Sequence, residues 1–452
     1  MRKSIFVLIL FVVQLNTYAQ EFKFKHIGKE QGLSQSRVNA ITEDKDGFLW
    51  FGTDDGLNRY NGREITVFKH NPEIERTLSD NWINCLYVDN KGILWVGTLE
   101  GGLNRYDKYF NKFDSYRADP RNESALHSDN ITSIVQHDEN SLWIGTDNGL
   151  HLFTISTGKF QRYLDEMVNP NNPSKVIKND QIRTLYQDRN GVLWIGTTRS
   201  GLLSYDLKTQ SFKDHSDLDA KGDYVVENSN RIRAIYEDSN GNLWIGYDGG
   251  YLAKYDRATN KYTYYFNDEH DEHSLSSRRV TSILEDHIGQ LWIATADGID
   301  LYDPEKDNFR VVKAIEKNPF SMRDNFVRVL YEDKAHSMWL GTDTYGITVY
   351  HRSIGKFNHI NTDSYDAKGL RTNTIFCFAE ESLEKIWIGT IGEGLAVFNR
   401  KSREIVHYGR EQNYTHENIL CLEKSGQKLW FGTWGGGLNY FDLEKQQFNK
   451  TP

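Results

Sequence analysis

Arginines gather at the starts of several short apolar runs, although the chain is acidic overall, with a formal net charge of -9. Guanidinium groups recognise carboxylate and sulfate groups through paired hydrogen bonds. We therefore predict a site for an anionic ligand, such as a uronic-acid oligosaccharide. The arginines at these positions are Arg37, Arg183, Arg231, Arg233, Arg278, Arg279 and Arg328.

The alternative interpretation is that these arginines serve the fold and form ion pairs within it. Several of the same runs end in carboxylate side chains, which would compete with a ligand for the guanidinium groups. The neighbouring acids on which this interpretation depends include Glu237, Asp238, Glu285 and Glu332.

Aromatic residues stand close to the arginines in the sequence. Trp82 and Trp434 lie outside the position that the other tryptophans share, and Tyr247 and Tyr345 lie in similar turns. Exposed rings on a polar surface are typical of a recognition site, where sugar rings can stack; packing of the loops is the alternative. The ligand-binding residues that we predict are Trp82, Arg183, Arg231, Arg233, Arg279, Arg328 and Tyr345.

The elements that must position these residues are strands of a repeated unit. The pattern Leu-Trp-apolar-Gly begins at Leu49 and recurs every 43 to 51 residues. Each unit has four short runs rich in β-branched and aromatic residues, separated by Gly, Asn and Asp turn signals. Four antiparallel strands per repeat predict an all-β fold, a β-propeller of four-stranded blades. The repeated tryptophans are Trp50, Trp95, Trp143, Trp194, Trp244, Trp292, Trp339, Trp387 and Trp430.

Propellers usually close with about four to eight blades, and nine repeats exceed this number. The leading segment 22–26 resembles the last strand of a repeat, so it can complete the final blade of a ring. We predict a seven-bladed propeller over residues 20–355 and the first two blades of a second, incomplete propeller over 356–452. A single ring of eight or nine blades is the alternative.

Motifs of enzymes and metal sites are missing from the sequence. The 14 histidines form no HExxH, no serine stands in a Gly-x-Ser-x-Gly elbow, and Asp44-Lys45-Asp46-Gly47 lacks the Glu that closes a calcium loop. The three cysteines share one repeat position, which favours small buried side chains over metal ligands or disulfides. We predict no catalytic residues, no metal and no cofactor. The alternatives are a propeller lyase of the streptogramin-inactivating kind and a protein-binding scaffold.

The first 19 residues have the pattern of a secretory signal peptide. A basic start, an apolar run and the small residue Ala19 predict export and cleavage after Ala19. Removing Arg2 and Lys3 changes the net charge to -9 - 2 = -11. This charge argues against nucleic acid as a partner. No later stretch is apolar enough to span a membrane, so we expect no membrane anchor in this segment.

Several phrases of the chain resemble the two-component regulator propeller repeats. They are Gly32-Leu33-Ser34, Asp46-Gly47-Phe48-Leu49-Trp50-Phe51-Gly52-Thr53, Asp55-Gly56-Leu57-Asn58-Arg59-Tyr60-Asn61-Gly62 and the recurring Leu-Trp-Ile-Gly-Thr, and the resemblance covers residues 22–449. In that family the repeats form the exported sensor region of hybrid two-component histidine kinases of Bacteroidetes, where two seven-bladed propellers precede a membrane helix and a kinase.

The resemblance implies a periplasmic sensor region that binds an oligosaccharide and can form a homodimer. Such sensors typically detect oligosaccharides released from complex glycans. This chain departs from the family pattern, since it has nine repeats and no kinase or regulator domain. We therefore expect a sensor portion and no enzyme.

Overall fold

The computed structural model describes residues 22–163, 180–215, 231–351, 369–409 and 416–450, except for 258, 260, 317, 319 and 403. The predicted signal peptide lies outside the described residues. The described chain consists of nine four-stranded antiparallel sheets and one short 3-10 helix, η1 (Lys29–Gln31). The all-β prediction is therefore confirmed. No helix in this part of the chain is long and apolar enough to cross a membrane.

The first four sheets each take their strands in chain order, and we number the sheets along the chain. Sheet one has β2 (Val38–Glu43), β3 (Leu49–Thr53), β4 (Gly56–Tyr60) and β5 (Ile65–Phe68). Sheet two has β6 (Ile83–Val88), β7 (Leu94–Thr98), β8 (Leu103–Asp107) and β9 (Lys112–Tyr116). Sheet three has β10 (Ile131–Asp138), β11 (Ser141–Thr146), β12 (Gly149–Thr154) and β13 (Lys159–Arg162). Sheet four has β14 (Ile182–Gln187), β15 (Val192–Thr197), β16 (Leu202–Asp206) and β17 (Ser211–Asp214).

Sheets five and six also take their strands in chain order, whereas sheet seven takes its fourth strand from the start of the described chain. Sheet five has β18 (Ile232–Glu237), β19 (Leu243–Tyr247), β20 (Leu252–Asp256) and β21 (Lys261–Tyr265). Sheet six has β22 (Val280–Glu285), β23 (Leu291–Thr295), β24 (Gly298–Asp303) and β25 (Asn308–Val312). Sheet seven has β26 (Val327–Glu332), β27 (Met338–Thr342), β28 (Ile347–Tyr350) and β1 (Phe24–Ile27).

The last two sheets belong to a separate compact unit. The chain divides into residues 1–355, which we call unit 1, and 356–452, which we call unit 2. Sheet eight has β29 (Ile375–Ser382), β30 (Lys385–Thr390), β31 (Leu395–Asn399) and β32 (Ile405–Tyr408). Sheet nine has β33 (Ile419–Ser425), β34 (Lys428–Thr433), β35 (Gly437–Asp442) and β36 (Gln447–Lys450). That these two sheets begin a second propeller stays a prediction.

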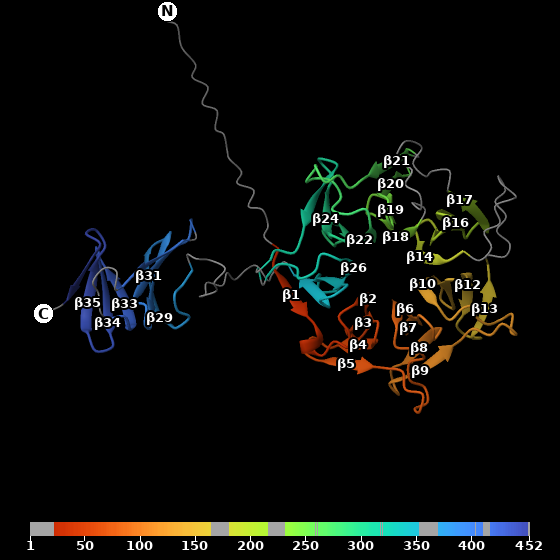
Figure 1. The fold of residues 1–452 in the computed structure, drawn as a ribbon, viewed down its shortest axis with the longest axis horizontal. Coiled ribbons are helices and arrows are strands. Elements are labelled where there is room, and N and C mark those ends of the chain that lie inside the picture. Colours follow the sequence, from red (N-terminus) through yellow and green to blue (C-terminus); the bar gives the residue numbers. More distant parts are fainter. Residues whose placement is uncertain are drawn as a thin grey trace, which may run out of the picture. The chain divides into compact units, whose positions relative to one another are not determined.

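Contacts within unit 1 run full circle. The first strands touch in the order β2, β6, β10, β14, β18, β22 and β26, and β26 touches β2 again. Figure 1 shows these strands innermost, around a common centre. Strand β1 pairs with β28, so the start of the described chain supplies the outer strand of the last sheet. One apolar cluster joins Val38 of sheet one to Trp339 of sheet seven.

The second strand of each repeat explains the recurring tetrapeptide. In sheet two, Trp95 is buried and its Nε1 donates to the turn residue Asp89 at 3.0 Å. The same carboxylate accepts the backbone N–H groups of Lys91 and Ile93, so it orders the turn and the indole together. The glycine that follows makes room for the next sheet, because a Cβ on Gly97 would lie 2.7 Å from Ile131.

Candidate ligand-binding site

A β-bulge recurs near the start of the first strand of every sheet. In β14, Ile182 pairs with Thr197 and Thr184 pairs with Gly196, so Arg183 is left out of the ladder. A bulge re-aims the side chain of the extra residue. In unit 1 all seven bulge residues line one hollow of about 500 Å³, which we call the central hollow. They are Asn39, Asn84, Thr132, Arg183, Arg233, Thr281 and Arg328.

The four short polar bulge residues tie neighbouring sheets together. Each donates a side-chain hydrogen bond to the carbonyl of the first residue of the next first strand. These bonds are Asn39 Nδ2 to Ile83 O at 3.0 Å, Asn84 Nδ2 to Ile131 O at 3.1 Å, Thr132 Oγ1 to Ile182 O at 2.7 Å and Thr281 Oγ1 to Val327 O at 2.5 Å.

The arginines at the bulges, and two that directly precede first strands, reach acids in the turns between second and third strands. Arg233 and Arg279 lie 2.8 and 2.7 Å from the carboxylate of Asp248, and Arg183 lies 3.8 Å from it. Arg328 lies 2.7 Å from Asp343. Arg37 lies 3.1 Å from Asp343 and 3.3 Å from Asp54.

The ion-pair interpretation is thus right about pairing but wrong about the partners. Glu237 ends β18 and lies 3.1 Å from Arg257, and Glu285 accepts a bond from the hydroxyl of Ser239 at 2.7 Å. Glu332 faces His287, and Asp238 accepts the indole N–H of Trp244 at 2.8 Å. These acids lie at the ends of the first strands or just after them, whereas the arginines lie at the starts, so the strand length keeps them apart.

Positive charge exceeds negative charge around Asp248. Burial alone would raise the pKa of Asp248, but Arg233, Arg279 and Arg183 together hold it below its usual value. Burial lowers the pKa of the Arg183 guanidinium, and the nearby charges of Arg233, Arg231 and Arg279 act in the same direction, against Asp248. One carboxylate therefore faces three guanidinium groups, and Arg231 adds a fourth positive charge near Arg183.

The structure brings together some of the residues predicted for the site. Arg183, Arg233, Arg328 and Trp82 line the central hollow, and the Trp82 side chain is 38% exposed. Arg231 and Arg279 stand beside the hollow through their interaction with Asp248 and Arg183. Tyr345 is exposed in the turn after β27 and is not among the residues that line the hollow.

Two other aromatic residues do not join this site. Tyr247 is only 5% exposed and packs on Tyr251, with ring centroids 4.2 Å apart, so the interpretation of its ring as an exposed stacking surface is wrong. Trp434 is exposed, so packing of its loop does not bury it, but it belongs to unit 2.

Sequence reasoning missed the uncharged polar residues that line the central hollow. Asn39, Asn84, Thr132 and Thr281 occupy the same repeat position as Arg183, which is the second residue of each first strand. The aligned repeats contain this signal, but a search for charge alone passes over it.

Comparisons with known proteins agree with the repeat structure. The two-component regulator propeller family matches in seven places, each covering the first two strands of one sheet of unit 1. The matched residues are 32–55, 77–100, 125–148, 177–199, 227–249, 274–297 and 321–344.

The chain spans only part of the length of the relatives that it matches. Histidine kinase P4 of Formosa agariphila is 31% identical over 249 residues, which are 44% of this chain and 18% of that protein. The crystal structure of the extracellular domain of a hybrid two-component system from B. thetaiotaomicron matches with a TM-score of 0.67 and 28% identity. This match covers 96% of the chain and 55% of that structure.

A lyase shares the fold at lower similarity. Virginiamycin B lyase from Staphylococcus aureus matches with a TM-score of 0.52 and 15% identity, over 73% of this chain and 99% of the lyase. Identity this low supports a common fold alone. The seven repeat matches show that the chain carries two-component regulator propeller repeats, and the likeness to the extracellular domain from B. thetaiotaomicron agrees with them.

Proposed function

We propose that the chain is the ligand-sensing region of a hybrid two-component sensor, exported to the periplasm. We further propose that the central hollow of unit 1 binds an oligosaccharide that carries carboxylate or sulfate groups. The single observation that carries this proposal is the excess of arginine around Asp248. With Arg183, Arg233 and Arg279 counted against one aspartate, the local charge is 3 - 1 = +2.

The lining offers the further groups that an acidic sugar needs. Asp248 holds the guanidinium groups in place and leaves further N–H groups for a ligand, since each guanidinium has five donors. Asn and Thr side chains around the rest of the hollow can exchange hydrogen bonds with sugar hydroxyls. Trp82 presents a partly exposed ring at the same hollow, where a sugar face can stack.

Calorimetric titration of the purified chain tests the proposal. We expect binding of uronic-acid oligosaccharides, weaker binding of neutral ones of equal length, and weakening by salt. The double variant Arg233→Ala, Arg328→Ala should lose at least about tenfold in affinity, because paired guanidinium contacts are among the strong ones. Arg63→Ala, which removes an exposed arginine outside the lining, is the matched control.

Equal indifference of the wild type and the double variant to every sugar would contradict the proposal. Light scattering of the same samples tests the homodimer that the family resemblance implies.

A catalytic role for the hollow has less support. Cys85 lines it, but burial raises the pKa of its thiol to about 12, so the thiol stays protonated and is a weak nucleophile. The lyase match supports only the fold. Turnover of acidic glycans by the purified chain would favour the lyase over the sensor.

A further inference from the structure

In unit 1 a repeated hydrogen bond joins the turn of one sheet to the first strand of the next sheet. The backbone N–H of the second turn residue between the first and second strands donates to a Glu or Gln at the first strand of the next sheet. The pairs are Asn90 to Gln136 at 3.1 Å, Arg189 to Glu237 at 3.0 Å, Ser239 to Glu285 at 2.6 Å, His287 to Glu332 at 2.9 Å and Lys334 to Glu43 at 2.9 Å.

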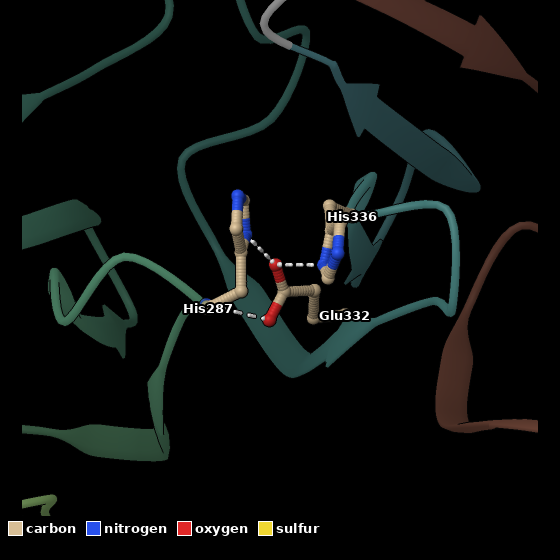
Figure 2. Close-up of side chains that lie close together, drawn as sticks. All are labelled: His287, Glu332 and His336. Carbon is tan, nitrogen blue, oxygen red and sulfur yellow. Dashed lines mark hydrogen bonds and ion pairs between the residues drawn. The ribbon is translucent and has the colours of Figure 1, made fainter.

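At the joint between sheets six and seven, two imidazoles share this carboxylate. His287 Nδ1 lies 2.5 Å and His336 Nδ1 lies 3.5 Å from the same oxygen, Oε1 of Glu332. Figure 2 shows both rings beside this oxygen, and their centroids are 3.8 Å apart. The other carboxylate oxygen, Oε2, accepts the backbone N–H of His287 and so fixes the orientation of the group.

At the equivalent contacts between other sheets, the carboxylate faces other kinds of side chain. Glu43 faces the ammonium of Lys334 at 3.1 Å, Glu237 faces Arg189 at 3.9 Å, and Glu285 accepts from the hydroxyl of Ser239. The inter-sheet bond therefore does not require histidine.

His336 occupies a turn position that favours glycine. Its φ is +62°, and the equivalent residues of sheets one, two, four, five and six are all glycines with φ between +83° and +88°. A residue with a Cβ adopts this conformation at a cost in free energy. Here the unfavourable residue places an imidazole against Glu332.

We propose that His287, Glu332 and His336 bind a divalent transition metal ion, with Zn²⁺ as the best candidate. Two imidazole nitrogens and one carboxylate oxygen are a zinc ligand set, and water can complete the tetrahedron. The three ligand atoms lie within 4.8 Å of one another. The side chains are 31%, 15% and 56% exposed in that order, so solvent reaches the site and His336 has room to turn. The hydrogen bond from the His287 backbone N–H to Oε2 holds the Glu332 carboxylate in one orientation, as partners of metal-binding carboxylates usually do.

Bound zinc would link sheet six to sheet seven, the sheet that β1 completes. This site uses none of the residues of the central hollow, so it is independent of the proposed function. No short ligand motif marks it, since His287 comes from a different repeat than Glu332 and His336.

Zinc titration of the full, untagged, metal-free chain tests the proposal. We expect one saturable Zn²⁺ site by calorimetry, a higher melting temperature with Zn²⁺, and weaker binding at pH 5.5 than at pH 7.5, because protonated imidazole cannot ligate. His336→Gly should weaken binding about tenfold or more. The metal-free variant should remain folded, because glycine fits this turn.

Two further variants separate the metal site from the structural bond. Glu332→Gln keeps an acceptor for the His287 N–H, as Gln136 does in sheet three, but should lose zinc affinity. His270→Ala removes an exposed imidazole elsewhere and should bind zinc like the wild type. The proposal is overturned if the wild type shows no saturable binding, or if His336→Gly and Glu332→Gln bind zinc as it does.

Discussion

Unit 1 and unit 2 repeat the same four-stranded sheet, yet a register position that is buried in sheet seven of unit 1 is exposed in sheet eight of unit 2. Leu330 of β26 pairs with Leu340 and is 5% exposed, whereas Phe378 of β29 pairs with Ile388 and is 63% exposed. In unit 1 each first strand touches first strands on both sides, while the described part of unit 2 holds two sheets. Neighbouring sheets therefore bury this position, and the sheet alone does not.

The bulge position differs between the units in its chemistry. The bulge residues of unit 1 are Asn, Thr or Arg and line the central hollow, while those of unit 2 are Phe376 and Leu420. Both of these apolar side chains are exposed. Among the described residues, polar side chains at the bulges are thus a property of unit 1.

Loosening β1 should give the largest loss of stability in unit 1, because sheet seven would then be poorly paired. Phe24 is buried in the cluster that holds Trp292 and Tyr350. Phe24→Ala should cost about 3–5 kcal/mol of stability in unit 1. Hydrogen exchange by mass spectrometry should show faster exchange in β26 to β28 and no change in unit 2.

Lys25 lies on the same strand and is exposed, so Lys25→Ala is the control and should change stability by less than about 0.5 kcal/mol. Equal acceleration of exchange in both units by Phe24→Ala would show that β1 does not stabilise unit 1 specifically.

How far the sequence predicts this molecule depends on whether a feature is local. The tetrapeptide around Trp95 and the turn at Asp89 recur every 43 to 51 residues, and the segment at Phe24 resembles the last strand of a repeat, so the sheets could be predicted. The acids that face the arginines could not, because Asp248 meets Arg233 only through the pairing of two strands. Cys421 was expected to be buried but is exposed, since burial of this position also depends on neighbouring sheets.

Sheet six has a titratable group at a repeat position where sheet nine has an uncharged one. The stability of the two units should therefore depend differently on pH. Asp300 in β24 is fully buried, and Asn439 holds the equivalent position in β35. Burial raises the pKa of Asp300 from 3.8 to about 7, although hydrogen bonds from Ser276 act in the opposite direction. Because the folded pKa exceeds the unfolded one, this group favours folding below about pH 4, and that contribution is lost as pH rises to about 7.

Asp300→Asn should therefore remove a pH dependence of up to about 4 kcal/mol in unit 1, at about 1.4 kcal/mol for each pKa unit. The variant should exceed the wild type in stability at pH 8 by more than at pH 5, measured by denaturant unfolding at both values. His151, whose pKa burial lowers to about 3, opposes this trend in the wild type and the variant alike, so the difference isolates Asp300. A difference that is constant with pH would show that Asp300 is ionised in the folded chain at pH 5.

The smallest effect is expected from Phe378→Thr, which tests directly whether burial at this register position comes from neighbouring sheets. Because Phe378 is mostly exposed, its replacement should change the stability of unit 2 by about 0.5 kcal/mol or less. The matched variant Leu330→Thr removes a buried side chain and should cost unit 1 about 2–5 kcal/mol. Phe378→Thr should also lower the fluorescence of a dye that binds exposed apolar surface. If it destabilises unit 2 as much as Leu330→Thr destabilises unit 1, Phe378 is covered in solution, and the contrast between the units is smaller than their exposures indicate.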